Sequence, residues 1–336
     1  MLEYVCYATL FVCDISRQSL LQRKATGSKV GCVSPSKLVI SENKYLLNCG
    51  IKVNFCLGVL WLGNSVIPGS PDVISHLQKI GKRVFYVSNN SSKTREEFVS
   101  KFSRLGYPAS KVSVSLFTLI LIIQFMLYFN KAVTFFVHCT ENILCTAYLT
   151  ACYLQDICFK KKVYVVGSKG ITDELDATSI KHLDVGPDPM CSDMTTLLKN
   201  EVQLDPDVGA VVVGFDEHFS FPKMVKAASY LRQPDCLFIG TNTDEVFPSE
   251  FPLTVPGTGT FVKAIETCTN RQAFKIGKPS PYVCEAIINR HQVDPSKTLM
   301  IGDRQPVPRN VFRNLQTGFH SDVILAYDSF SLTLAR

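Results

Sequence analysis

The chain alternates short apolar runs with longer stretches in which apolar residues recur every three or four positions. From residue 51 this alternation occurs twice, with runs at 51–55 and 83–87 and amphipathic stretches at 71–80 and 94–105. Gly81 and Gly106 close the two stretches, and Thr94-x-x-Glu97 forms a capping box at the start of the second. Because strand, helix, strand and helix follow in this order, the pattern predicts a parallel sheet.

The middle of the chain contains a second set of apolar runs. Val208 to Val213 is rich in valine, and further runs lie at 163–166 and 237–239, with a helix-like segment at 223–231. Runs without polar alternation are typical of strands that are buried on both faces of a sheet. We therefore expect this part of the chain to have an α/β core of its own.

The last part of the chain returns to the first pattern. Ser280 is expected to cap a helix with Pro281 at its first position, and Thr298 to Ile301 reads as a strand. We predict an α/β fold in which a parallel-sheet core is split in sequence by an inserted α/β domain. The core is expected at residues 51–159 and 269–336, the inserted domain at 160–268 and an unassigned leader at 1–50.

Composition limits the function classes. With 336 residues, 46% of them hydrophobic and 19% charged, the chain is typical of a globular protein with room for two domains. Its net charge of +6 is scattered, so we expect no nucleic-acid partner. The 13 cysteines form no C-x-x-C pair, which argues against zinc. Met1 to Cys13 lacks the features of a secretory signal, so we expect a cytoplasmic protein with reduced thiols.

One segment, at residues 115–144, departs from the pattern. Leu116 to Phe129 is almost wholly apolar, and Ala132 to Val137 forms a second apolar patch after Asn130 and Lys131. A membrane span needs about 20 consecutive apolar residues, and this run is shorter and interrupted. We interpret it as an atypical apolar insertion and expect no membrane anchor.

Polar residues stand beside several predicted elements. Ser88 and Asn89 follow one strand, Asp303 follows another, and Lys278 precedes a helix. Each alone has an ordinary explanation as a polar turn, a turn cap or a surface lysine. At the carboxyl edge of one parallel sheet, however, hydroxyl, amide and ammonium groups would suit an anion. A carboxylate at the same edge is a natural ligand for Mg²⁺.

Five stretches around these residues resemble the haloacid dehalogenase superfamily, and within it the p-nitrophenylphosphatase, phosphoglycolate phosphatase and pyridoxal phosphatase family. They are Val87–Lys93, Gly214–Phe219, Pro256–Gly259, Ile276–Pro281 and Ile301–Arg304. The resemblance implies a Rossmann-like core, an inserted α/β cap domain and Mg²⁺-dependent hydrolysis of small phosphorylated metabolites. It also implies that Ser88 and Asn89 hold phosphoryl oxygens, that Lys278 neutralises charge and that Asp303 binds Mg²⁺.

The resemblance adds four substrate-binding candidates and a possible homodimer formed through the cap domain. Gly58 lies in Gly58-Val59-Leu60-Trp61, which matches the end of the family's first motif, and Asn90 follows Asn89. Phe215 and Phe247 occupy cap positions where pyridoxal phosphatases carry a tyrosine and a histidine. These two residues therefore argue against pyridoxal phosphate as the substrate.

The first motif departs from the family at two positions. The family has a nucleophilic aspartate and an acid–base aspartate where this chain has Phe55 and Leu57. Neither side chain can attack phosphorus, bind a metal or carry a proton. The insertion at 115–144 and Val307-Pro308, where the family has threonine and aspartate, depart as well.

We hypothesise that these departures share one origin in an imperfect gene model or an aberrant transcript. The sequence then predicts a phosphomonoester hydrolase of the phosphoglycolate or p-nitrophenyl phosphate type that is inactive as written. The alternative is a genuine, catalytically inactive relative that acts as a binding module.

Overall fold

The computed structural model describes residues 60–108, 140–247 and 252–294, together with short strands at 10–12, 38–39, 52–56, 298–301 and 332–333. Apart from two of these strands, the predicted leader lies outside the described residues, as does most of the predicted insertion. Leu57, Gly58 and Asp303 also lie outside them. Within the described part of the chain, no helix has the length and apolar character needed to cross a membrane.

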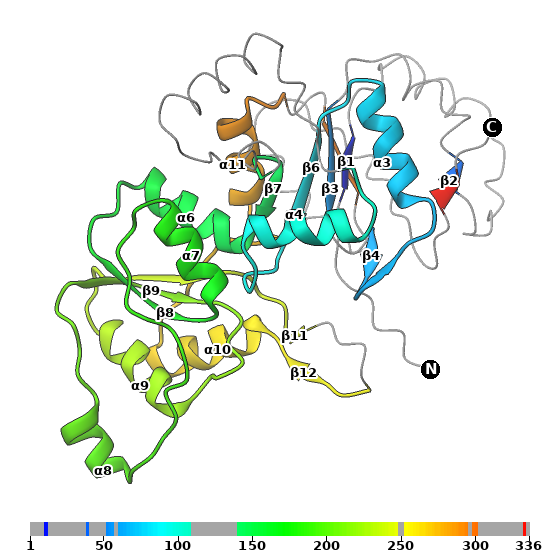
Figure 1. The fold of residues 1–336 in the computed structure, drawn as a ribbon. Coiled ribbons are helices and arrows are strands. Elements are labelled where there is room, and N and C mark those ends of the chain that lie inside the picture. The colour runs from blue at the N-terminus through cyan, green and yellow to red at the C-terminus, as the bar shows by residue number, and fades with distance from the viewer. Residues whose placement is uncertain are drawn as a thin grey trace, which may run out of the picture.

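A five-stranded sheet forms one half of the molecule (Figure 1). Its strand order is β1-β14-β3-β6-β7, with β1 antiparallel at one edge and the other four strands parallel. The strands are β1 (Leu10–Val12), β3 (Lys52–Cys56), β6 (Val84–Ser88), β7 (Ile143–Cys145) and β14 (Thr298–Ile301). The predicted parallel sheet is confirmed, and the carboxyl ends of β3, β6 and β14 share one edge.

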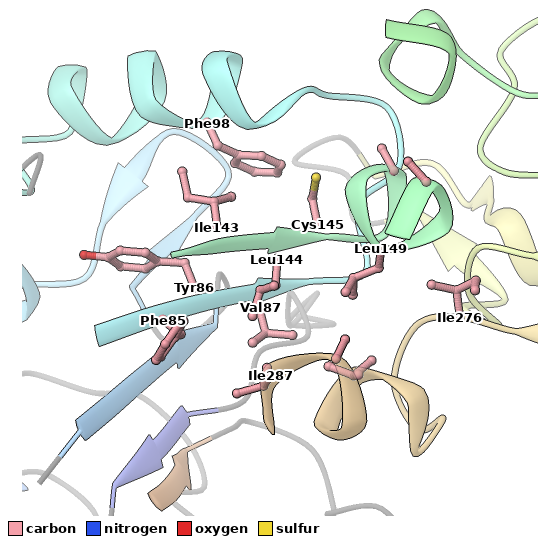
Figure 2. Packing of buried hydrophobic residues seen from close by; sticks show 14 of the residues in the cluster. Phe85, Tyr86, Val87, Phe98, Ile143, Leu144, Cys145, Leu149, Ile276 and Ile287 are labelled. Carbon is pink, nitrogen blue, oxygen red and sulfur yellow. The ribbon is translucent and has the colours of Figure 1, made fainter. Parts of the chain in front are cut away.

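Helices cover both faces of this sheet. They are α3 (Ser70–Lys79), α4 (Arg95–Arg104), α6 (Thr146–Asp156) and α11 (Tyr282–His291). Figure 2 shows Phe98 of α4 on one side of β6 and β7 and Ile287 of α11 on the other. Side chains alternate between the faces of a strand, so Tyr86 packs against Phe102 of α4 while the neighbouring Phe85 packs against α11.

A four-stranded parallel sheet with the order β13-β10-β9-β8 forms the other half. Its strands are β8 (Lys162–Val166), β9 (Val208–Val213), β10 (Leu237–Gly240) and β13 (Phe274–Lys275). Its helices are α7 (Lys169–Ala177), α9 (Phe221–Tyr230) and α10 (Thr258–Thr269). Every residue of β9 is buried, which confirms the valine-rich run as a strand covered on both faces.

The two halves share part of their apolar core. Val165 and Val212, on one face of the four-stranded sheet, belong with Ile171 of α7 to the same buried cluster as Phe85 and Val87 of β6. The opposite face forms a separate cluster with residues of α9 and α10. One continuous core therefore joins the five-stranded sheet to one face of the four-stranded sheet.

Short elements complete the described chain. Three strand pairs are β2 (Leu38–Val39) with β15 (Leu332–Thr333), β4 (Trp61–Leu62) with β5 (Ser65–Val66), and β11 (Val246–Phe247) with β12 (Val255–Pro256). The short helix α8 (Met194–Thr196) continues into a π-helical turn at Leu197–Glu201.

Three sequence expectations differ in detail from the structure. Ile143 and Leu144, assigned to the insertion, begin β7, which at three residues is too short to show the alternation by which strands are recognised in a sequence. β13 pairs with the four-stranded sheet, although it lies in the predicted core. Helix α11 starts at Tyr282 with Pro281 as its N-cap, while the Ser280 hydroxyl accepts a 3.3 Å bond from the Tyr282 N–H.

Candidate anion site

The end of β6 forms a tight polar turn. The Ser88 Oγ accepts a hydrogen bond of 3.1 Å from the Asn90 N–H. The Asn90 Oδ1 accepts bonds from the main-chain N–H groups of Ser92 and Lys93, at 3.0 and 3.2 Å. The turn leads into α4, where Thr94 and Glu97 form the predicted capping box. Asn90 was predicted to bind substrate, and in the structure its side-chain oxygen stabilises this turn.

Asn89 joins this turn to Lys278, which lies 189 positions away in the sequence. Its Oδ1 accepts a bond of 2.9 Å from the Lys278 N–H, and its Nδ2 donates a bond of 3.1 Å to the Lys278 carbonyl. Two bonds from one carboxamide fix the main chain of Lys278 beside the end of β6. The structure therefore brings Ser88, Asn89 and Lys278 together, while Asn89 itself contacts protein where the resemblance implied a phosphoryl oxygen.

The loop after β10 closes around Asn89 from the four-stranded sheet. The Asp244 Oδ2 accepts a bond of 3.2 Å from the Asn89 Nδ2. Asn242 Nδ2 and Thr146 Oγ1 both donate to the Asn89 carbonyl, at 2.7 and 2.9 Å. Burial raises the pKa of Asp244, opposed by the Asn89 bond and by the charge of Lys278. Asn89 is thus held by both halves of the molecule.

Gly277 permits the close approach of these chains. A Cβ at this position would lie 2.7 Å from the Asn89 Oδ1 and 2.7 Å from the Thr241 carbonyl oxygen. The Gly277 N–H donates a bond of 2.8 Å to that same carbonyl. A side chain here would push Lys278 away from Asn89, which explains the glycine before the predicted site lysine.

The far end of the turn is fixed against the four-stranded sheet. The Ser91 Oγ accepts a bond of 3.2 Å from the Phe215 N–H. Arg95 and Glu174 of α7 form an ion pair of 3.0 Å, in which the Glu174 side chain is 1% exposed. The Arg95 guanidinium also lies 3.8 Å from the centre of the Tyr148 ring. The turn that carries Ser88 is therefore held at both of its ends.

Phe215 and Phe247 stack on one another, with ring centres 4.3 Å apart. Phe219 and Phe261 form a second stacked pair at 4.6 Å, and 6.3 Å separates Phe215 from Phe261. The four rings are only partly buried. Phe215 lies two residues after β9 and Phe247 three residues beyond Asp244, so both predicted residues belong to segments that contact the turn after β6. They present apolar surface without hydrogen-bonding groups.

The positions where the family has its catalytic aspartates can be located from the sequence and from the pairing of β3 with β6. Phe55 pairs with Tyr86 and Cys56 with Val87, so β3 ends at the same sheet edge as β6, the strand that ends in Ser88. Phenylalanine and leucine side chains hold no metal and carry no proton. Asp303, two residues after the end of β14 in the sequence, lies outside the described residues, as do Leu57 and Gly58.

In the part of the chain that the structure describes, the donors for the implied magnesium site are missing. Among residues 60–108, 140–247 and 252–294, no group of three His, Cys, Asp or Glu is placed to hold a metal. Phe55 and Leu57 contribute hydrocarbon side chains where the family has carboxylates. The chain as written therefore supplies Asp303 without its expected aspartate partners.

Sequence reasoning did not single out Asp244, Asn242 or the Arg95–Glu174 pair. A sequence signal for Asp244 and Asn242 was present. The polar stretch Thr241-Asn242-Thr243-Asp244 follows a predicted buried strand, just as Ser88 and Asn89 come at the end of another strand. No comparable signal marks Arg95 and Glu174. They belong to two different helices, and only the packing of these helices brings the two side chains into contact.

Comparisons with known proteins agree with this architecture. A model described as haloacid dehalogenase-like hydrolase matches residues 56–181, and a second with the same description matches residues 151–306. Glycerol-3-phosphate phosphatase of Rattus norvegicus is 36% identical over 292 residues, 85% of this chain and 81% of that protein. Chronophin of Bos taurus is 36% identical over 250 residues, 74% of this chain and 72% of that protein.

A solved structure, p-nitrophenyl phosphatase from Archaeoglobus fulgidus, has a similar fold. It aligns with a TM-score of 0.53 at 22% identity and covers 73% of this chain and 75% of its own. At this identity the likeness concerns the fold alone, and it agrees with the predicted Rossmann-type α/β architecture.

Proposed function

The chain belongs to the haloacid dehalogenase-like hydrolase family, and on that premise we propose that it binds small phosphomonoesters beside Ser88 and Lys278. The phosphatases among its relatives support a hydrolase of phosphoric monoesters as the ancestral activity. Our proposal for the chain with the present sequence is narrower. The chain retains the anion-binding side of such a site and lacks the residues that carry out the hydrolytic step.

One observation carries the proposal, namely the double hydrogen bond between Asn89 and the main chain of Lys278. It holds the main chain of Lys278 beside Asn89, the residue after Ser88, at the carboxyl edge of a parallel sheet, where ligands of α/β proteins bind. A lysine and a hydroxyl together can balance and hydrogen-bond a phosphate group. Only a folded chain brings these residues together.

Hydrolysis needs a nucleophile that this chain does not have. In the family an aspartate attacks phosphorus, and a second aspartate transfers the proton. Phe55 and Leu57 stand in their places. Removing a nucleophile that acts as part of a unit costs on the order of 10⁴- to 10⁶-fold in turnover. Mg²⁺ dependence, which is general in the family, is accordingly expected only once carboxylates are present at these positions.

For the substrate, we propose a small phosphomonoester of the phosphoglycolate or p-nitrophenyl phosphate type. Relatives named glycerol-3-phosphate phosphatase support the small size of the leaving group. Phe215 and Phe247 offer no hydrogen bond to a polar ring, which disfavours pyridoxal phosphate. A cytoplasmic location and a homodimer formed through residues 160–268 complete the proposal and await direct measurement.

Hydrolysis of p-nitrophenyl phosphate with Mg²⁺ tests the proposal. The unchanged chain should show no turnover above a Lys278→Ala control. The double variant Phe55→Asp, Leu57→Asp should hydrolyse the ester at least about 10⁴-fold faster, and Lys278→Ala in that background should remove the gain. Lys278-dependent turnover by the unchanged chain would contradict the lost hydrolytic step. A folded double variant without activity would support the binding module as the native role.

A further inference from the structure

The Asn89 carboxamide has three hydrogen-bond partners and a defined orientation. Its oxygen faces the Lys278 N–H at 2.9 Å, and its nitrogen faces the Lys278 carbonyl at 3.1 Å and the Asp244 Oδ2 at 3.2 Å. Each hydrogen of the nitrogen is therefore used, one toward Lys278 and the other toward Asp244. Rotation of the carboxamide would break its bond to Asp244 as well as its two bonds to Lys278.

Asp244 is well suited to hold this group in place. An ionised carboxylate only accepts hydrogen bonds, so it favours the orientation in which the Asn89 nitrogen, and not its oxygen, points toward the loop after β10. A bond from an amide to a charged acceptor is stronger than a bond between neutral groups. Asp244 therefore stabilises the same orientation that Lys278 requires.

The main chain of Asp244 is itself fixed. Its N–H donates a bond of 3.0 Å to the Asn242 Oδ1, while the Asn242 Nδ2 donates to the Asn89 carbonyl. Its carbonyl accepts a bond of 2.8 Å from the Gly259 N–H at the start of α10. A Cβ on Gly259 would lie 2.4 Å from the Thr243 carbonyl oxygen, so the two segments are in close contact. The carboxylate is thus presented by a rigid loop.

We propose that Asp244 is a positioning residue of the anion site, which holds the Asn89 carboxamide and through it the main chain of Lys278. This inference rests on the proposed anion-binding function and adds a residue to it. Asp244 does not contact the anion, since its own negative charge would repel a phosphate. Its charge instead lies within electrostatic range of Lys278.

Hydrogen exchange of the Lys278 main-chain N–H, followed by NMR, tests the inference without any ligand. In Asp244→Ala this N–H should exchange about tenfold faster, as expected when roughly one hydrogen bond of support is lost. The N–H groups of Ile276 and Gly277, which donate to Gly240 and Thr241, should keep their rates as internal controls. Asp244→Asn, which retains an acceptor oxygen, should restore most of the protection.

Asp235→Ala is the matched control variant, because the Asp235 side chain is 72% exposed and pairs only with Lys161 among the described contacts. It should leave the Lys278 rate unchanged. An unchanged Lys278 rate in Asp244→Ala would overturn the inference. An equal acceleration at Ile276, Gly277 and Lys278 would also overturn it, because it would mean general loosening of the fold.

A double-mutant cycle on the binding of inorganic phosphate separates this inference from the proposed function. Asp244→Ala should weaken binding about tenfold in the unchanged chain and have little effect in Asn89→Ala, because the two residues act through one contact. Equal effects in both backgrounds would contradict positioning through Asn89. If the unchanged chain bound no phosphate, the proposed function would fail, and the exchange rate of Lys278 would still decide the role of Asp244.

Discussion

Two neighbouring strands of the five-stranded sheet, β6 and β3, lead into segments of very different character. The turn after β6 is held by Lys278, by the loop after β10 and by α7. At the end of β3 the sequence has Phe55 and Leu57 where its family has aspartates. The proposed anion-binding side of the site is held by contacts from several elements, whereas Phe55 and Leu57 supply no carboxylate.

This difference is explained by what each residue does for the fold. Asn89, Ser91 and Arg95 join segments that are far apart in the sequence, so their loss would disturb packing as well as binding. Catalytic carboxylates are held close together against their mutual repulsion, and their replacement by apolar residues need not cost stability. On our proposal, a chain without the nucleophile can therefore still keep the anion site.

Among the variants that test this comparison, Glu174→Ala is expected to lower the free energy of unfolding the most. It leaves the Arg95 guanidinium, whose side chain is only 15% exposed, without its carboxylate partner. Removing one member of a buried ion pair costs about 3–5 kcal/mol of unfolding free energy. Urea unfolding measures the loss, and the turn after β6 should bind phosphate more weakly in the variant.

Asp207→Ala is the control for this prediction, because its side chain is 73% exposed in a surface ion pair with Lys162. Its loss should change the unfolding free energy by less than about 1 kcal/mol. Similar losses in the two variants would show that α7 does not support the turn specifically.

A smaller effect is expected from Gly170→Ala, at the start of α7. The added Cβ would lie 2.6 Å from the main-chain carbon of Ser92, so α7 and the turn must separate. Forced overpacking of this kind costs about 1–3 kcal/mol, which thermal or urea unfolding can detect. Gly186→Ala meets no atom within 4 Å and is the matched control. Equal stability of Gly170→Ala and Gly186→Ala would contradict the close approach of α7 to the turn after β6.

Local patterns in the sequence predicted much of the fold. The capping box at Thr94 and the valine-rich strand Val208–Val213 were correct because each depends on neighbouring residues alone. The strand β7 was missed because its three residues are too few to show a period, and it runs directly into the helix α6 at Thr146. Periodicity identifies elements best where they are long enough for the pattern to repeat.

The candidate site was predicted only in part. Ser88, Asn89 and Lys278 were named from their places next to strands and by resemblance, and the structure brings them together. The partners of Asn89 could not be foreseen, since Asp244 lies 155 residues away and Lys278 lies 189 residues away. A side chain that serves the fold and one that binds a ligand look the same in sequence, and only their contacts separate them.

Binding of inorganic phosphate by equilibrium dialysis tests the central claim most directly. The unchanged chain should bind phosphate at a single saturable site, and Lys278→Ala should weaken the affinity at least about tenfold, because a charge-assisted contact is lost. Lys199→Ala, which removes an exposed lysine distant from the turn after β6, should bind like the unchanged chain. Equal affinity in all three proteins, or no saturable binding by the unchanged chain, would contradict the retention of an anion site.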